Sequence, residues 1–475
     1  MRLALCWIAV ALAAALNFGS YWAIGEGLVA LAALGIYLPW PRRPVGVRPE
    51  FALWCMTLFG AFLNPLATRQ DPVWMRRPAG AGEPWILAAQ VASLGVVCLY
   101  GPAGRGRLFA ALAGWRFPLV VSAFAVQAVA AILGRPDPQI DVFYFLNEGV
   151  RGLAQGLNPY AMQFSALPAA LSAGYQDPSY HFDVYSYLPG TLLLTLPALV
   201  LGDVRWVMLG AVLLAALGLR RLARAFGMSR SQADLPAVAF LCYPGLLHVM
   251  QHAWVEPLIV CLWVGALVSL FTRPPRGILA TACAGLFLVV KQYAPPLLLP
   301  LMAAGLSWRQ ALLAAVAPVT LSIPFFLWGP GDFYWDAFWY QVQAPMRDDA
   351  LSLNAYLMNE WGSSLPGWLS LGAPLLGAAY LCLAVMRRKP FDLVLERTAG
   401  MYLLLFLFNK FAFANYYFLL EAVLLVAVAA ACVPEAVADP GVSAGVPAPH
   451  EIPPDLIDAD SRHGQRVPVL SGTQA

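Results

Sequence analysis

Residues 117–145 read FPLVVSAFAVQAVAAILGRPDPQIDVFYF, an apolar run that stops abruptly at a polar and aromatic segment. The apolar part, 117–134, carries no charge and is about as long as a helix must be to cross the hydrocarbon core of a bilayer. Asp137 and Asp141 follow directly, and a carboxylate at a membrane boundary is costly to desolvate. The stretch therefore predicts a membrane helix that carries two functional acids just beyond its end.

Similar apolar runs recur along the chain, which is 60% hydrophobic and only 12% charged. This composition is typical of a polytopic membrane protein, because a helix satisfies its own backbone polar groups in lipid. We expect an all-α polytopic membrane helical bundle of about 12–15 spans, with an external region of short helices and aromatic loops. Residues 234–250 and 293–306 are two of the expected spans. The lipid bilayer is the expected partner, whereas a net charge of +3 gives no reason to expect nucleic acid.

The arginines indicate which loops face the cytoplasm, because positive charge is retained on that side. Most arginine clusters share one side if Leu188 to Leu201, a short segment with Pro189 and Pro197, does not cross fully. This parity places the loops 135–187 and 329–366 outside. Arginine far outnumbers lysine, as in GC-rich bacteria, so we expect a multi-pass protein of the bacterial plasma (inner) membrane with its active site facing outward.

Three parts are predicted along the chain. Residues 1–116 form an N-terminal transmembrane module of about four spans, and residues 117–433 form the transmembrane domain that carries both external loops. Residues 434–475 are rich in Pro, Ala, Gly and Asp without a helical pattern, which predicts a disordered cytoplasmic tail. The eight cysteines include no CxxC pair, and we predict no disulfide framework.

The first external loop offers candidates for acid–base chemistry and for sugar binding. Asp141 at its head is a candidate general base, although an aspartate there also suits a helix N-cap. A short amphipathic helix on the membrane surface is predicted to follow it. The aromatic residues suit either stacking on sugar rings or an interfacial belt. The candidate substrate contacts in this loop are Tyr144, Asn158, Tyr160, His181 and Tyr187.

Three cations are candidates for binding a phosphate. Lys291 lies between two apolar runs that are barely long enough to span, so it faces a cavity unless it snorkels to the surface. Arg347, in the second external loop, either binds a phosphate or pairs with a neighbouring aspartate. Lys410 ends a predicted span and either caps that helix or adds charge to the same cavity.

His248, His252 and Glu256 recur every four residues, so one helix face is predicted to present all three. A metal site is one alternative. No motif such as H-E-x-x-H is present, however, and a contact of Glu256 with an acceptor sugar is favoured. Because phosphate-loop, nucleophile-elbow and dinucleotide-binding patterns are also missing from the sequence, we predict no metal and no cofactor.

An external carboxylate, cations near the boundary and aromatic walls suit the transfer of a sugar from a lipid-linked phosphate. The carboxylate removes a proton from the acceptor hydroxyl as that oxygen attacks the anomeric carbon. The cations stabilise the charge that develops on the departing phosphate. The alternative is a lipid-linked-sugar flippase or small-molecule transporter, which should carry polar residues at mid-membrane, whereas here they gather towards one face.

The sequence resembles the bacterial polytopic glycosyltransferases of the GT-C superfamily, and is most similar to the polyprenyl-phosphate-mannose-dependent alpha-1,2-mannosyltransferases. The resemblance covers roughly residues 117–430. The residues that carry it are Asp141-x2-Tyr144, Gly156-x-Asn158-Pro159-Tyr160, Tyr187-x-Pro189, Glu256-Pro257, Lys291-Gln292 and Arg347-x-Asp349-x-x-Ser352.

The resemblance implies an inverting glycosyltransferase that moves a hexose, with mannose as first candidate, from a polyprenyl-phosphate donor to a glycan or glycolipid hydroxyl. It implies Asp141 as the catalytic base. Asp137 is the second acid, four residues away rather than in the D-x-D spacing of many members. The expected donor phosphate ligands are Lys291, Arg347 and Lys410. The other expected substrate contacts are His252, Glu256, Gln292, Asp349 and Asn415.

Overall fold

A computed structural model describes residues 2–15, 22–38, 49–68, 83–101, 111–138, 140–164, 184–272 and 274–432. These ranges belong to one compact unit, Met1–Ala438. Every regular element in them is helical, so the predicted all-α class is confirmed. The candidate His181 and the predicted tail 434–475 lie outside the described residues.

The helices fall into four groups along the chain. The first holds α1 (Arg2–Ala15), α2 (Ala23–Tyr37), α3 (Pro49–Thr68), α4 (Glu83–Cys98) and α6 (Arg116–Gly134). The second, in the first predicted external loop, holds α7 (Asp141–Ala154), η2 (Pro159–Ala161), α9 (Pro189–Thr195) and α10 (Ala198–Leu201).

The third group forms the middle of the bundle. It holds α11 (Arg205–Ala225), α12 (Asp234–Leu241), α13 (Leu246–Gln251), α14 (Glu256–Phe271), α15 (Gly277–Leu288), η3 (Pro295–Leu297), α16 (Leu298–Ala303) and α17 (Trp308–Trp328). The fourth holds α18 (Pro330–Tyr334), the π-helical η4 (Trp335–Trp339), α19 (Tyr340–Gln343), α20 (Leu353–Trp361), α21 (Gly367–Met386), α22 (Phe391–Leu407) and α23 (Ala414–Ala431).

Five of these helices, α6, α11, α17, α21 and α23, are long and apolar enough to cross a membrane, and five shorter apolar helices accompany them. The chain thus has the architecture of a multi-pass membrane protein. Two of the predicted spans are not single helices. Residues 234–250 form two helices, α12 and α13, separated by a break around Pro244. Residues 293–306 contain the short helices η3, which begins at Pro295, and α16. The number of spans stays a prediction.

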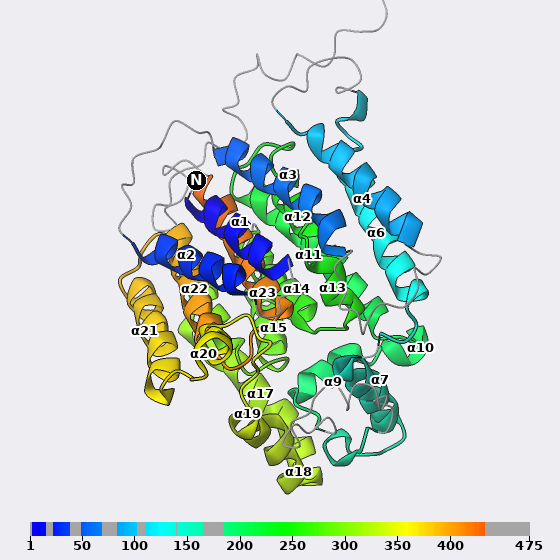
Figure 1. The fold of residues 1–475 in the computed structure, drawn as a ribbon, viewed down its shortest axis with the longest axis vertical. Helices are drawn as coiled ribbons and strands as arrows, with labels where there is room; N and C mark the ends of the chain where they lie inside the picture. The colour runs from blue at the N-terminus through cyan, green and yellow to red at the C-terminus, as the bar shows by residue number, and fades with distance from the viewer. Residues whose placement is uncertain are drawn as a thin grey trace, which may run out of the picture. The chain divides into compact units, whose positions relative to one another are not determined.

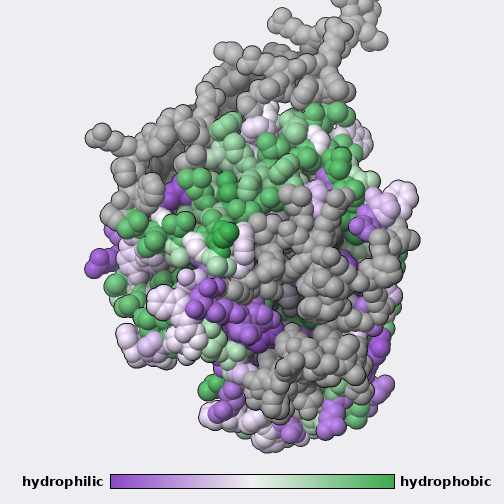
Figure 2. Space-filling model, viewed as in Figure 1, coloured by the Kyte–Doolittle hydropathy of each residue, from purple (hydrophilic) through white to green (hydrophobic). Residues whose placement is uncertain are grey.

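The first helices of the chain pack against the last ones (Figure 1). α1 contacts α23, α2 contacts α22, and α3 contacts α12. Arg2 at the start of α1 pairs with Glu396 of α22. Figure 2 shows a broad hydrophobic band on the face that carries α1 to α3, with hydrophilic residues gathered below it. A lipid-facing surface of this kind matches the composition.

The two predicted external loops meet at one end of the bundle (Figure 1). α7 packs on α9, α9 on α17, and η2 on α18. The segment Leu188 to Leu201 consists of α9 and α10, interrupted at Leu196 and Pro197. α9 has 7 residues and α10 has 4, so each is far shorter than the roughly 30 Å core of a bilayer.

Candidate functional site

The predicted amphipathic helix of the first loop is present as α7, and Asp141 is its first residue. Extended backbone at Ile140 ends the preceding segment, and Val142, Phe145, Leu146 and Val150 form the buried face. Asp141 Oδ1 accepts a hydrogen bond of 2.7 Å from the Val142 amide. The negative charge of Asp141 thus interacts favourably with the positive end of the helix dipole, while Ile140 is the N-cap residue.

Asp141 lies within electrostatic reach of two predicted phosphate ligands. Burial raises the pKa of its carboxyl, while the Val142 amide, Arg347 and Lys291 act in the opposite direction. Part of its surface stays accessible even though protein atoms surround it. The structure therefore gathers Asp141, Lys291 and Arg347, which come from segments far apart in the sequence.

Lys291 forms a buried ion pair with Glu256. Its Nζ lies 2.6 Å from Glu256 Oε1, and its side chain is 10% exposed, against 0% for Glu256. Asn415 Nδ2 donates to the same oxygen at 2.8 Å, and the Tyr293 hydroxyl also donates to it. Lys291 therefore does not snorkel outward. The anion that its burial demands is a carboxylate of the protein itself.

Three tyrosine rings surround the Lys291 ammonium. Nζ lies 5.5 Å from the ring centre of Tyr187, 5.1 Å from that of Tyr293 and 4.9 Å from that of Tyr416. Each ring face adds a cation–π attraction that is stronger away from water. Tyr187 also lies within electrostatic reach of both Asp141 and Glu256, so it is close to the candidate base as well as to the buried pair.

The Arg347 guanidinium and the Asp349 carboxylate form a bidentate ion pair. Its Nε donates at 2.6 Å to Asp349 Oδ1, Nη2 contacts Oδ2, and the guanidinium lies 5.1 Å from the Phe413 ring. The Asp349 side chain is 45% exposed, against 11% for Arg347. Solvent thus reaches this pair, in contrast with the sealed Lys291–Glu256 pair.

Lys410 points to a different part of the second loop. Its Nζ donates to the carbonyl oxygens of Val342 at 2.9 Å and Ala344 at 2.6 Å, which close the end of α19. Partial burial lowers its pKa. Lys410 thus caps α19 and not α22, the helix that ends shortly before it. Its backbone carbonyl accepts from the Arg347 amide at 3.3 Å, so it supports the Arg347 loop.

Two polar side chains join the two loops directly. Gln292 Nε2 donates to the Ser186 carbonyl at 3.2 Å and to the Ala337 carbonyl at 2.7 Å. Asp336 Oδ2 accepts from the Tyr185 amide at 2.8 Å. These bonds satisfy backbone groups of irregular segments that would otherwise be buried without partners. Gln292, a predicted substrate contact, thus has a bridging function in the structure.

Three other predicted contacts support the first loop from within. Asn158 caps η2 by accepting from the Tyr160 amide at 3.2 Å. The Tyr160 hydroxyl donates to the Tyr187 carbonyl at 2.8 Å, and its ring packs on Phe333 at 4.9 Å. The Tyr144 hydroxyl bonds to Asp137, which fixes the second acid to the outer face of α7.

The prediction that one helix face presents His248, His252 and Glu256 is wrong. The helix breaks after α13, where Ala253 adopts a φ of 56°, and α14 starts at Glu256. The imidazole of His252 stacks on Trp254 at 5.1 Å, and its Nδ1 lies 2.8 Å from the His248 carbonyl. The break turns Glu256 towards Lys291 instead. Among the described residues no His, Cys, Asp and Glu side chains are grouped to hold a metal.

Sequence reasoning missed several residues of the site and two buried acids. Tyr293 and Tyr416 were hidden among many interfacial aromatics, and Asp336 was one of several aspartates in its loop. Glu421, within α23, and Glu26, within α2, are 1% and 4% exposed. Neither oxygen of Glu421 has a partner among the described residues, whereas the Ser352 backbone lies within hydrogen-bonding reach of Glu26. The sequence signal that could have found them is a lone acid inside an apolar run.

No protein-family model, curated protein or solved structure matches this chain. What the site can do is therefore argued from its own side chains: a partly accessible carboxylate at a helix start, an arginine–aspartate pair that solvent reaches on the aspartate side, and a buried lysine–glutamate pair walled by tyrosines.

Proposed function

We propose that the chain is an inverting glycosyltransferase of the membrane. It moves a hexose, with mannose as the first candidate, from a polyprenyl-phosphate donor to an acceptor hydroxyl at the outer face. One observation carries the proposal: Asp141, Arg347 and Lys291 converge at the end of the bundle where the two loops meet. A carboxylate beside two cations and several tyrosines suits an attack by a hydroxyl on a sugar phosphate.

In this proposal Asp141 accepts the proton of the acceptor hydroxyl. Its raised pKa makes it a stronger base than an ordinary aspartate, and the nearby cations Arg347 and Lys291 act against that shift. The hydroxyl oxygen forms the new bond to the anomeric carbon as the bond to the phosphate oxygen breaks. The polyprenyl phosphate leaves with the electron pair of the broken bond on its phosphate oxygen.

The two cations divide the work on the phosphate. The Arg347–Asp349 pair is accessible to solvent, so a phosphate can replace Asp349 on the planar guanidinium fork. The Lys291–Glu256 pair is buried and has no net charge, so Lys291 contributes mainly by holding the tyrosine rings around it. Arg347 is accordingly the principal donor ligand, with Lys291 behind it.

The experiment is sugar transfer from a polyprenyl-phosphate hexose in proteoliposomes. Asp141→Asn should lower the rate by ~100-fold or more, a common scale for loss of a general base. Asp332→Asn is the matched control, because Asp332 is an exposed aspartate of α18 at the same end of the bundle. Transfer by Asp141→Asn at the wild-type rate would contradict the proposal.

One observation favours the transporter alternative. Glu421 lies eight residues into the 18-residue helix α23, and both its oxygens lack a partner among the described residues. The Tyr243 hydroxyl, within electrostatic reach of Glu421, and Trp7 Nε1 also lack partners in the described part of the chain, and the two rings lie 6.3 Å apart. Buried acids inside a membrane bundle are typical of proton or ion pathways.

The two functions predict opposite effects of Glu421→Gln. A glycosyltransferase keeps its rate of sugar transfer, because Glu421 is not in contact with the Asp141 region. A proton-coupled transporter loses the uptake that a pH gradient drives into proteoliposomes. Loss of uptake with no detectable sugar transfer by the wild-type protein would establish the transporter and remove the glycosyltransferase proposal.

A further inference from the structure

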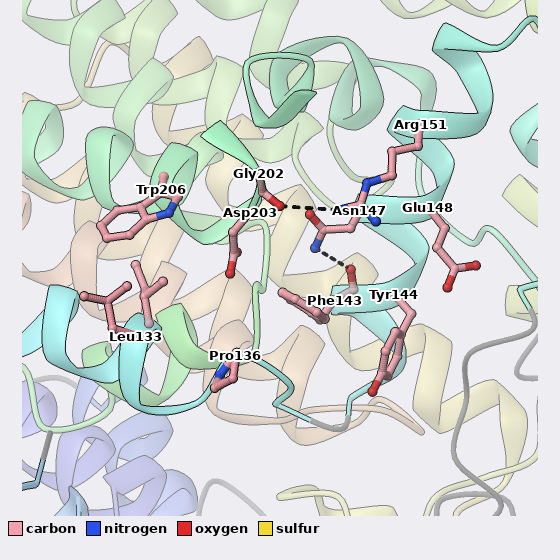
Figure 3. A pocket seen from close by; sticks show the side chains of 11 residues that line it. Leu133, Pro136, Phe143, Tyr144, Asn147, Glu148, Arg151, Gly202, Asp203 and Trp206 are labelled. Atoms are coloured by element: carbon pink, nitrogen blue, oxygen red, sulfur yellow. Dashed lines mark hydrogen bonds between the residues drawn. The ribbon is translucent and has the colours of Figure 1, made fainter. Parts of the chain in front are cut away.

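A pocket of about 530 Å³ opens between the ends of α6 and α11 and the outer face of α7 (Figure 3). Its walls are of two kinds. Leu133 and Trp206 belong to the end turns of two candidate spans, and Leu133 is 68% exposed. Asn147, Glu148 and Arg151 come from α7, which lies beyond those ends. The pocket thus combines an apolar wall at the level of the spans with a polar wall outside them.

Most polar side chains of the pocket are already engaged. Asn147 donates to the Phe143 carbonyl at 2.9 Å and accepts from the Val204 amide at 3.1 Å. Asp203 places both oxygens on the Arg205 guanidinium, at 3.1 and 3.0 Å from Nε. These groups shape the pocket, and their hydrogen-bonding capacity is largely used.

Two side chains of opposite charge keep capacity to spare. Arg151 makes one long contact of 3.4 Å, to the Gly202 carbonyl, and offers four further N–H donors. Glu148 accepts no hydrogen bond from the described residues. Residues three apart lie on the same side of a helix, so α7 presents an acceptor and a donor side by side. Figure 3 shows Arg151 directed towards Gly202 and Glu148 on the turn before it.

We propose that this pocket binds a bilayer phospholipid whose headgroup joins a phosphate to a primary ammonium. The phosphate fits Arg151, which offers paired donors, and the ammonium fits the Glu148 carboxylate. The glycerol and the first methylenes lie against Leu133 and Trp206, at the depth where tryptophan is enriched in membrane proteins. The apolar wall distinguishes such a lipid from a soluble zwitterion. The proposal does not depend on the glycosyltransferase.

A bound lipid would also hold α7 in place. Tyr144 lines the same pocket and bonds to Asp137, and Asp141 lies one turn earlier on the helix. The headgroup therefore braces the helix that begins with the candidate base, and lipid composition becomes a variable of the site.

The test is lipid retention measured by native mass spectrometry, after equilibration with phosphatidylethanolamine, phosphatidylcholine or phosphatidylglycerol in separate samples. The wild-type protein should retain one phosphatidylethanolamine. Phosphatidylcholine should be retained roughly tenfold less, the scale of one charge-assisted hydrogen bond, because its ammonium carries no hydrogen. Phosphatidylglycerol, which has no ammonium, should also be retained less. Equal retention of all three lipids overturns the proposal.

Two single variants sharpen the test. Glu148→Gln should abolish the preference for phosphatidylethanolamine over phosphatidylcholine. Arg151→Gln should lower the retention of both lipids by roughly tenfold. Glu83→Gln and Arg309→Gln, at exposed helix starts elsewhere, are the matched controls and should change neither lipid. An unaltered ratio of phosphatidylethanolamine to phosphatidylcholine in Glu148→Gln, or unaltered retention of both lipids in Arg151→Gln, contradicts the proposal. So does displacement of the bound lipid by octyl mannoside at equal concentration, which would assign the pocket to a sugar.

Because Glu148 and Arg151 lie on the outer face of α7, both variants should fold. Thermal unfolding in detergent checks this directly. If either variant unfolds, a headgroup diazirine analogue of phosphatidylethanolamine provides the second measurement on the wild-type protein. Cross-links within residues 132–151 and 202–206 support the proposal, and cross-links spread evenly over the lipid-facing helices overturn it.

Discussion

Lys291 Nζ lies 2.6 Å from Glu256 Oε1 across 35 residues of sequence, and the same oxygen accepts from Asn415 and Tyr293. The other oxygen of Glu256 has no partner among the described residues. One carboxylate oxygen thus joins the irregular segment around Lys291, the start of α14 and the start of α23. Non-helical backbone at this depth is tolerated only where protein buries it, as here.

The first prediction concerns this pair. Glu256→Gln or Lys291→Met leaves one charge buried without its partner, which typically costs about 3–5 kcal/mol. Each variant should therefore melt several degrees below the wild type in detergent. The double variant removes both charges and should recover part of that loss. Melting temperatures of all four proteins provide the measurement, and strictly additive losses would show that the two charges do not interact.

The second prediction separates activity from stability at Asp141. Burial raises its pKa in the folded protein, so the folded state holds a proton over a pH range in which the unfolded state has released it. Stability contributed by the protonated carboxyl is then lost as pH rises through the folded value. Asp141→Asn removes this loss, so at neutral pH the variant should be at least as stable as the wild type while transfer is lost.

The pH profile provides the measurement for the same residue. A base must be ionised, so the wild-type rate should fall as pH is lowered through the raised pKa, at a higher pH than for an ordinary aspartate. Asp332→Asn should keep this acid limb. An acid limb at the usual aspartate position would argue against Asp141 as the base.

The third prediction ranks the two cations. Arg347→Met should raise the donor concentration needed for half-maximal transfer by roughly tenfold, the scale of a lost charge-assisted pair. Asp349→Asn should have the opposite effect, because it removes the carboxylate that occupies the same fork. Initial rates over a donor series measure both. A weaker response to Arg347→Met than to Lys291→Met would reverse the proposed order.

The fourth prediction concerns the link between the loops. Gln292→Leu leaves the Ser186 and Ala337 carbonyls without their donor, which should cost about 1–3 kcal/mol. Gln292→Glu is a stricter variant, because a carboxylate keeps the size but repels both carbonyls. Protease cleavage of the two loops in the folded protein should accelerate in both variants. Unchanged cleavage would show that other contacts hold the loops together.

The fifth prediction concerns orientation. Single cysteines at Gln163 and Glu360, both exposed, should react with an impermeant reagent from outside, and one at Arg221 should not. The background must lack the native thiols, because Cys98 and Cys382 are exposed. Ser352 is unsuitable despite its place in the loop, since it is fully buried and caps α20. Labelling at Arg221 from outside would mean that α9 and α10 together cross the membrane.

The helical class and the amphipathic helix α7 could be predicted because apolar length and helical periodicity are local properties of the sequence. The meeting of Asp141, Lys291 and Arg347 was anticipated only as a shared outer boundary. The partner of Lys291 depends on tertiary packing, and the sequence alone does not show that it is Glu256. For Arg347 the sequence left phosphate binding and pairing with a neighbouring aspartate both open, and the structure shows the pair with Asp349.

The failed prediction at His252 has a simple physical cause. A spacing of four residues predicts one helix face only while the helix continues. Here the helix ends at a positive φ at Ala253, a backbone conformation that residues other than glycine rarely adopt. Alanine at this position gives no sequence signal of a break. Spans 234–250 and 293–306 were overestimated because prolines inside apolar runs do not lower hydropathy enough to reveal an interruption.

Because α1 packs against α23, the bundle can close only after nearly the whole chain has been synthesised. Arg2 and its partner Glu396 are separated by 394 positions, which a ribosome covers in roughly 20–80 s. During that interval α1 and α2 lack the helices that later pack against them. Closure of the bundle is therefore a late event, and a chain that stops before α22 presents the quality-control machinery with two helices that lack their later packing partners and with Arg2 unpaired.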